Sequence, residues 1–472
     1  MREVFSLLKI LTPRPSGQIQ KAAPMDNQPI MSVSGIRGKV GESLSPSLYS
    51  AMAFLQTKTA GGGRMLVGRD TRPTGPDLAR AAFRGIRLAG GIPVDIGIAP
   101  TPTTCFAVKH LGASGGIVIT ASHNPLPYNG YKMVHGSGRL YAGDECDALY
   151  RQYAAGDFPR QSDFDSSDDT PAETLNAADA HVAAIVGAVD SEAIRNAGIR
   201  IAIDSVNGAG GAVFPRLLDK LGVAWEGVHT DLGGNFAHNP EPRPEHLADL
   251  AALLTSGSGF WGGFAFDPDA DRLAPMGENG EPISEEMTFA LALGSVLARN
   301  ATSVATNLST SMVIDDIVRA FGVKLFRTKI GEANVVQAMR EHDCGIGGEG
   351  NGGVIYPRVS TVRDGPVALA LILERMAKEK KKLTALAGEW NQYPIVKKKI
   401  PLGDTNAADT IARLAETFGG EQIDMQDGIK LIRDYGWVHV RPSNTEPILR
   451  CYAEAKTPAQ AGELADMMMD LV

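Results

Sequence analysis

The chain has 472 residues, of which 43% are hydrophobic and 21% are charged, and its formal net charge is −8. This length exceeds what one hydrophobic core supports, so we expect three or four domains. The acidic balance gives no support to nucleic acid or to a membrane surface as a partner, whereas local positive sites for a small anion stay possible. The four cysteines are scattered without metal-binding spacing, and no apolar run reaches membrane-spanning length, so we expect a reduced, cytoplasmic protein.

The first 27 residues differ in character from the rest of the chain. Their apolar run, Val4 to Leu11, is too short for a convincing signal peptide. We expect residues 1–27 to be a disordered extension or an over-extended start.

Three stretches then repeat one order of strand, helix, strand, helix and third strand. The first strands and helices are expected at 64–68 and 77–89, at 199–203 and 213–221, and at 303–306 and 312–321. Second helices are expected at 103–111, 244–256 and 333–343, and third strands at 116–120, 260–266 and 344–348. This alternation predicts α/β layers, in which ligands bind beyond the carboxyl ends of the strands. Each third strand ends in an unusual loop, and we expect those loops, TASHNP, DPDADR and GEGNGG, to face one cleft.

The pattern changes after about residue 392, where strands at 396–400, 430–433, 436–441 and 448–455 accompany helices at 407–418 and 458–471. We expect a smaller α+β domain with antiparallel strands there. The predicted fold is therefore α/β, with three similar mixed α/β sheet domains and a C-terminal α+β domain. The predicted divisions are 28–170, 171–278, 279–390 and 391–472.

The loop DPDADR carries Asp267, Asp269 and Asp271 at alternate positions after an apolar strand. In an extended loop, alternate carboxylates can converge on one hard cation, and such oxygen ligands suit Mg²⁺. A solvated acidic turn is the simpler alternative. The loop is not an EF-hand, because Arg272 stands where that motif needs glycine.

The loop TASHNP presents Ser122 at the end of a strand. A turn or capping residue is the simplest interpretation. A serine hydrolase is disfavoured because His123 is adjacent in sequence and no GxSxG elbow is present. A third interpretation makes Ser122 the carrier of a phosphoryl group that Mg²⁺ bridges to the aspartates. Lys132, after an expected turn at 129–130, is then a candidate acid or base.

Two further loops contain candidate binding residues. RPSNTEP combines Arg441, Ser443, Asn444 and Thr445, with Arg450 nearby, and resembles an anion cradle more than an ordinary polar hairpin. GEGNGG offers Glu349 and Asn351, a carboxylate and an amide that suit sugar hydroxyls, and it lacks the GK[ST] of a P-loop. We expect Arg37, Arg69 and Arg72 either to form structural ion pairs or to offset negative charge in the cleft.

The segments SGIRG, GRDTRPTG, TASHNP, DPDADR, GGEGNGG and RPSNTEP occur in that order, and together they resemble the α-D-phosphohexomutases over residues 32–472. The resemblance implies four domains around a central cleft, a phosphoserine at Ser122 primed by a hexose bisphosphate, and Mg²⁺ at the three aspartates. It also implies that Lys132, Arg37 and Arg272 line the reaction site. Glu349 would bind sugar hydroxyls, and Arg441, Ser443, Asn444 and Thr445 would bind the phosphate that is not reacting.

The chain departs from part of that family at Asn351-Gly352-Gly353, because a histidine expected at position 353 is missing. Such loops look most like the archaeal-type phosphoglucosamine mutase branch, so we expect a glucosamine phosphate as substrate. A phosphomannomutase or phosphoglucomutase of the same mechanism is the alternative. Less favoured are an aspartyl phosphatase, with Asp267 and Asp269 supported by Asp315 and Asp316, and a sugar-phosphate-binding protein without turnover. The small phosphosugar is the expected partner, and the chain is expected to be a monomer or a homodimer.

Overall fold

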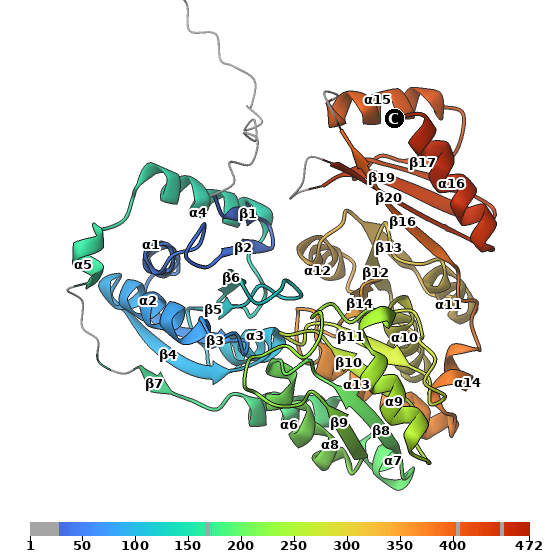
Figure 1. Ribbon diagram of the computed structural model, residues 1–472, viewed down its shortest axis with the longest axis horizontal. Coiled ribbons are helices and arrows are strands. Elements are labelled where there is room, and N and C mark those ends of the chain that lie inside the picture. Colours follow the sequence, from blue (N-terminus) through green and yellow to red (C-terminus); the bar gives the residue numbers. More distant parts are fainter. Residues whose placement is uncertain (1–27, 166–169, 171, 403–405, 444–447) are drawn as a thin grey trace, which may run out of the picture.

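The computed structural model describes residues 28–165, 170, 172–402, 406–443 and 448–472. Its strands form four separate sheets. Figure 1 shows these sheets following one another along a curved path, with the first and the last at opposite ends. The four-domain α/β architecture predicted from the sequence is confirmed.

The first sheet has the order β1-β2-β6-β5-β3-β4-β7. Its strands are β1 (Ile30–Ser32), β2 (Gly35–Lys39), β3 (Gly63–Arg69), β4 (Gly91–Ile98), β5 (Gly115–Ile119), β6 (Tyr128–His135) and β7 (Glu173–Thr174). The helices of this part are α1 (Pro46–Thr59), α2 (Gly75–Leu88), α3 (Thr101–His110), α4 (Gly143–Ala155) and α5 (Gln161–Asp165). Along β3, Met65 and Val67 face one apolar core and Leu66 faces another, so the strand is buried on both faces.

The turn that we predicted at 129–130 is wrong, because both residues belong to strand β6, which pairs antiparallel with β5 and β2. Gly130 fits there because it has no side chain: a Cβ would lie 2.4 Å from the carbonyl oxygen of Thr120 and 2.6 Å from that of Ile36. Glycine at this position allows the neighbouring strands to approach closely.

The second sheet, β11-β10-β8-β9, contains β8 (Arg200–Asp204), β9 (Ala224–Val228), β10 (Gly263–Phe266) and β11 (Leu273–Met276). Its helices are α6 (Ala178–Ala188), α7 (Ser191–Asn196), α8 (Phe214–Leu221) and α9 (Ala248–Ser256), with 3₁₀ turns η1 (Ala209–Ala212) and η2 (Pro244–His246). The single helix predicted over 244–256 is wrong. Leu247, with φ −105° and ψ 28°, separates η2 from α9.

The third sheet, β13-β12-β14-β15, repeats the topology of the second. It contains β12 (Val304–Asn307), β13 (Leu325–Thr328), β14 (Ile346–Glu349) and β15 (Gly353–Ile355), with helices α10 (Glu286–Arg299), α11 (Val313–Phe321), α12 (Glu332–Glu341), α13 (Gly365–Glu379) and α14 (Leu383–Ala387). In each of the three sheets, the third parallel strand is followed by an antiparallel one, which makes the sheets mixed. The unusual loops connect these two strands, so each begins at the carboxyl end of a buried strand.

The last sheet is antiparallel, with the order β16-β20-β19-β18-β17. It contains β16 (Ile395–Pro401), β17 (Ile423–Asp424), β18 (Ile429–Arg433), β19 (Gly436–Pro442) and β20 (Ile448–Ala455), and α15 (Ala407–Thr417) and α16 (Pro458–Asp470) share its apolar core. Polar side chains of this domain contact the third: Lys430 Nζ donates to the Leu308 carbonyl at 2.6 Å, and His439 Nδ1 lies 2.8 Å from Ser309 Oγ. Within the described part of the chain, none of the helices has both the length and the apolar character needed to span a membrane.

Candidate active site

The loop after β5 places Ser122 in a buried position, with only 1% of its surface exposed. Its backbone has φ +50°, a left-handed conformation that is uncommon outside glycine and typical of functional turns. The Ser122 amide donates to Thr120 Oγ1 at 2.9 Å, which helps to hold this turn.

Arg72, on the loop after β3, fastens the serine loop to the first sheet. Its Nε pairs with Asp70 Oδ2 at 3.0 Å, and both side chains are fully buried. Its Nη atoms donate to four carbonyl oxygens of the serine loop and its exit, those of Ser122, Asn124, Pro125 and Tyr128, at 2.6–2.9 Å. The structural ion pair considered for Arg72 is therefore present, and its neighbours make it a positioning group for Ser122.

The loop after β10 brings Asp267, Asp269 and Asp271 together, with one oxygen of each within 4.8 Å of the others. The loop is a tight turn and not the extended segment that we expected, because Ala270 adopts φ +50° and its carbonyl accepts from the Gly365 amide at 3.1 Å. All three carboxylates are buried. The solvated acidic turn is therefore excluded as an alternative.

The serine and aspartate loops meet although they are far apart in sequence. Ser122 Oγ donates to Asp267 Oδ2 at 3.0 Å. Burial and the charges of Asp269 and Asp271 raise the pKa of Asp267 well above its ordinary value. Burial alone would also raise the pKa of Asp271, but Arg363, Lys132 and Arg272 lower it below its ordinary value. The Oδ1 atoms of Asp269 and Asp271 are buried and have no hydrogen-bond partner.

Lys132, on β6, reaches the same carboxylates. Its Nζ lies 2.6 Å from Asp269 Oδ2 and 3.1 Å from Asp271 Oδ2. Burial lowers its pKa, but the charges of these two carboxylates outweigh burial, and the net pKa is raised. Thr101, at the start of α3, also donates to Asp269 Oδ2, at 2.5 Å.

Arg272, Arg37 and His123 also lie at the serine loop. Arg272 Nε lies 3.9 Å from Asp267 and 3.7 Å from Asp271, and its Nη2 lies 3.2 Å from His123 Nδ1. Arg37 donates to Asn124 at 3.2 Å. Burial, together with the charges of Arg272 and Arg37, lowers the pKa of His123 to about 2, so its ring is neutral and can accept a proton only weakly.

Sequence reasoning missed Arg363, which connects the second and third domains. Its guanidinium contacts Asp271 Oδ2 at 2.8 Å, Glu349 Oε2 at 2.9 Å and Glu332 Oε2 at 3.3 Å. It also fills the space beside Gly353, where a Cβ would lie 2.3 Å from Arg363 Cδ. No motif in the sequence distinguishes this arginine, because its partners come from three separate segments.

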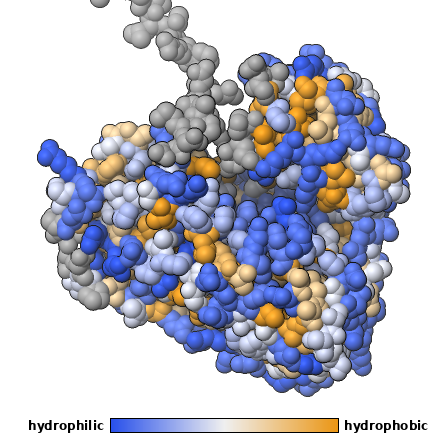
Figure 2. Space-filling model, in the orientation of Figure 1, coloured by the Kyte–Doolittle hydropathy of each residue, from blue (hydrophilic) through white to orange (hydrophobic). Residues whose placement is uncertain are grey.

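A cavity of about 270 Å³ collects most of the remaining predicted residues. Its lining includes Arg272, Glu349, Asn351, Arg441 and Arg450. Figure 2 shows the molecule hollowed between its first and last domains, with largely hydrophilic atoms in view around the hollow. Glu349 accepts from Asn307 at 2.9 Å as well as from Arg363, and Arg441 pairs with Asp427 at 3.1 Å.

The phosphate-loop residues are only partly within the described chain. The Ser443 amide donates to the Ile448 carbonyl at 2.9 Å, where the two strands of the hairpin approach each other. Asn444 and Thr445 lie outside the described residues. Asp315 and Asp316, the acids considered for a phosphatase, instead pair with Arg327 and Arg319 on the third domain and do not line the cavity.

Comparison with known families matches all four parts of the chain. The models described as phosphoglucomutase/phosphomannomutase α/β/α domains I, II and III match residues 29–160, 179–280 and 285–393, and the C-terminal domain model matches 375–471. These matches define a phosphohexomutase, an isomerase that acts on small phosphosugars. The chain belongs to the phosphoglucomutase/phosphomannomutase family, which confirms the resemblance seen in the sequence. The points at which we divide the domains stay predictions.

Relatives and solved structures cover nearly the whole chain. A phosphoglucomutase/phosphomannomutase of Thermococcus kodakarensis is 38% identical and covers 93% of this chain and 97% of its own. A probable phosphoglucosamine mutase of Methanopyrus kandleri is 36% identical, with coverages of 93% and 96%. The structure of a family member from Burkholderia thailandensis superposes with a TM-score of 0.83 at 28% identity, covering 94% of this chain and 96% of its own.

Proposed function

We propose that the protein interconverts glucosamine 6-phosphate and glucosamine 1-phosphate through a phosphorylated Ser122. The observation that carries the mechanism is the 3.0 Å contact between Ser122 Oγ and Asp267, one of three clustered carboxylates. The choice of sugar is supported by relatives named as probable phosphoglucosamine mutases at 32–36% identity. A phosphoglucomutase or phosphomannomutase is the second candidate, and the 38% identical relative with that name favours it.

The residues present fit a bound Mg²⁺. Three buried carboxylates within 4.8 Å repel one another, and two of their oxygens lack a hydrogen-bond partner. Hard oxygen ligands of this kind are those that Mg²⁺ prefers. Asp267, Asp269 and Asp271 would hold the ion next to the Ser122 oxygen. When bound, Mg²⁺ neutralises the charge that develops on a transferring phosphoryl group.

The chain's own residues then carry out two transfers. In the first, the bond between phosphorus and Ser122 Oγ breaks as phosphorus bonds to a hydroxyl oxygen of the sugar monophosphate, whose proton passes to a base. Ser122 Oγ takes up a proton, and the bisphosphate turns around in the cleft. In the second transfer, the bond between the other phosphorus and its sugar oxygen breaks as that phosphorus bonds to Ser122 Oγ, and the serine proton passes through the same acid or base to the released sugar oxygen. Lys132, which contacts two of the aspartates, is the proposed acid or base, and Arg37 and Arg272 offset negative charge.

The far end of the cavity would bind the phosphate that is not reacting. Arg441 and Arg450 line it, and Ser443, Asn444 and Thr445 follow Arg441 in the chain. Guanidinium forks suit phosphate oxygens. Glu349 and Asn351 line the same cavity, and they come from the third domain. We propose that they bind the sugar hydroxyls. With glycine at 353, Arg363 occupies the space of the missing histidine and provides a fixed positive charge there.

The test compares Ser122→Ala with a matched control, Ser47→Ala, on the exposed start of α1. After exposure to a radiolabelled hexose bisphosphate, the wild type and the control should carry acid-stable phosphate, whereas Ser122→Ala should carry none. The variant should lose turnover and still bind phosphosugar. Full turnover in Ser122→Ala, or acid-labile phosphate on Asp267, would overturn the mechanism.

The substrate is tested separately. Turnover with glucosamine 6-phosphate should exceed turnover with glucose 1-phosphate and mannose 1-phosphate when all three are assayed side by side. A preference for either of the latter would assign the second candidate and leave the phosphoserine mechanism intact.

A further inference from the structure

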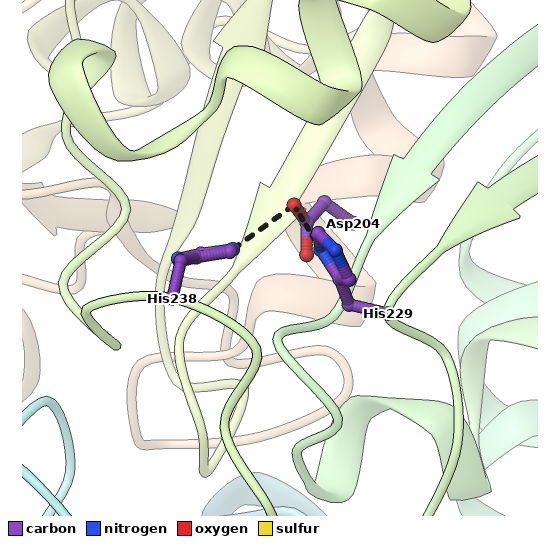
Figure 3. Close-up of side chains that lie close together, drawn as sticks. All are labelled: Asp204, His229 and His238. Atoms are coloured by element: carbon purple, nitrogen blue, oxygen red, sulfur yellow. Dashed lines mark hydrogen bonds and ion pairs between the residues drawn. The ribbon is translucent and has the colours of Figure 1, made fainter.

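A second group of metal-ligating side chains lies at the carboxyl end of the second sheet, where β8 runs beside β10, the strand that precedes the aspartate loop. It consists of Asp204 at the end of β8, His229 just after β9, and His238 in the following loop. Figure 3 shows both imidazole rings directed at the carboxylate of Asp204. His229 Nδ1 and His238 Nε2 each lie 3.1 Å from the same atom, Asp204 Oδ2. The phosphotransfer mechanism uses none of these residues.

The outer nitrogen of each ring has an acceptor oxygen close by. His238 Nδ1 lies 2.8 Å from the Asn239 carbonyl, which can only accept, so this nitrogen carries a proton. His229 Nε2 lies 3.1 Å from the carboxylate of Asp249. In the neutral tautomer that the Asn239 contact fixes, Nε2 of His238 presents its lone pair to Asp204, and His229 Nδ1 hydrogen-bonds to the same carboxylate oxygen. A lone pair facing a carboxylate is unfavourable unless a proton or a cation lies between them.

This arrangement is the one that metal-binding histidines adopt in proteins. A ligating histidine donates its other ring N–H to a carboxylate or a backbone carbonyl, and a ligating carboxylate is itself hydrogen-bonded. Asp204 meets the last condition, because its Oδ1 accepts from the Val206 amide at 2.8 Å. The supporting groups are therefore complete for all three side chains.

The backbone holds the cluster in place at some conformational cost. His229 has φ +51° and Val206 has φ +49°, both in the left-handed region. The His229 carbonyl accepts from the Asn207 amide at 2.7 Å and from Ser205 Oγ at 3.0 Å, which fastens the end of β9 to the loop after β8. Strained residues of this kind persist where the surroundings fix them and often mark functional sites.

We propose that Asp204, His229 and His238 form a Zn²⁺ site with a fourth position open to solvent. Two imidazoles and one carboxylate are a ligand set that zinc takes, with water as the fourth ligand. Mg²⁺ prefers oxygen ligands, which distinguishes this site from the aspartate loop. The charges of Asp204 and Asp249 balance one divalent cation. The rings are accessible to an entering ion, since the side chains of His229 and His238 are 19% and 15% exposed.

A metal here would secure a segment that leads to the cleft. The chain beyond His238 supplies Glu241, Pro242 and Arg243 to the wall of the 270 Å³ cavity. Phe236, two residues before His238, lies under the Arg72 guanidinium at 4.9 Å. The site would therefore hold the segment that links the second domain to the loop of Arg72, which supports Ser122.

The test titrates Zn²⁺ into full-length, chelator-treated protein by calorimetry, with Co²⁺ absorption as a second readout. The wild type should bind one more Zn²⁺ than His238→Gln and His229→Gln, and Co²⁺ should give a visible band typical of tetrahedral coordination that both variants lose. Asp249→Asn, which removes only the exposed supporting carboxylate, should weaken this binding by about 10-fold. His246→Gln, in η2 beyond that loop and outside the cluster, should bind Zn²⁺ as the wild type does.

Circular dichroism establishes whether each variant is folded. If either histidine variant is not folded, the weaker Zn²⁺ binding expected of Asp249→Asn tests the site instead. Zn²⁺ stoichiometry and the Co²⁺ band unchanged in His238→Gln and His229→Gln would overturn the proposal. The proposal would also be overturned if the wild type bound Zn²⁺ only at the aspartate loop. The three residues would then be a hydrogen-bonded cluster and not a metal site.

Discussion

Replacing Arg72 by Met should release the serine loop from the first domain. The Arg72 side chain is fully buried, pairs with Asp70 and donates to four backbone carbonyls at 2.6–2.9 Å. Methionine has similar length and apolar character but no donor. The substitution therefore removes every one of these hydrogen bonds while filling much of the same space.

The expected cost follows from what remains buried. Removing one partner of a buried ion pair costs about 3–5 kcal/mol, since the other charge is left without compensation. Burial already raises the pKa of Asp70, so Asp70 can take up a proton once Arg72 is gone. We therefore expect Arg72→Met to lower the local free energy of opening by an amount near the lower limit of this range, about 3 kcal/mol. Arg72→Lys should lose less, because an ammonium keeps the charge but cannot reproduce the planar fork.

Amide hydrogen exchange across residues 121–128 is the most direct assay, because it reports the local free energy of opening in a protein of several domains. Exchange there should accelerate by about 100-fold, which corresponds to about 3 kcal/mol, and mutase turnover should fall as Ser122 loses its fixed orientation. The control is Arg80→Met on α2, whose partner Asp77 is exposed, and it should cost less than about 1 kcal/mol. Unchanged exchange and full turnover in Arg72→Met would refute the positioning role.

Three other substitutions test separate features. Arg441→Gln should raise the KM of both phosphosugar isomers by about 10-fold or more, because a charge-assisted phosphate contact is lost, and an effect on one isomer alone would contradict a shared phosphate site. Burial raises the pKa of Glu286 to about 8, so the folded state holds a proton that the unfolded state releases, and this group's contribution to stability falls as pH rises from about 4.5 to 8. Glu286→Gln should lack that slope in urea unfolding followed across this pH range, and equal slopes would refute the buried neutral acid. Gly353→Ala should cost about 1–3 kcal/mol in unfolding and reduce turnover, since its Cβ would collide with Arg363, and a neutral result would mean that Arg363 is free to move.

Much of the fold follows from local pattern. Runs such as Met65-Leu66-Val67 predict strands buried on both faces, and the alternation with amphipathic helices predicts α/β layers. The short antiparallel returns at β11 and β15 were not predicted, because three or four residues carry too little periodicity. The helix over 244–256 was predicted as continuous because the break at Leu247 comes from backbone geometry and not from a helix-breaking residue.

The sequence by itself determined the chemical groups: a serine at the end of a strand, three aspartates in one loop, and a guanidinium beside a turn are all visible in a few consecutive residues. Only the tertiary structure decided that Ser122 meets Asp267 across 145 positions, that Arg72 fastens the serine loop, and that Arg363 takes the space beside Gly353. It also brought Asp204, His229 and His238 together, although no spacing in the chain marks them as a set. The reason is physical: side-chain type and strand order are encoded locally, whereas contacts between loops depend on how separate cores pack against one another.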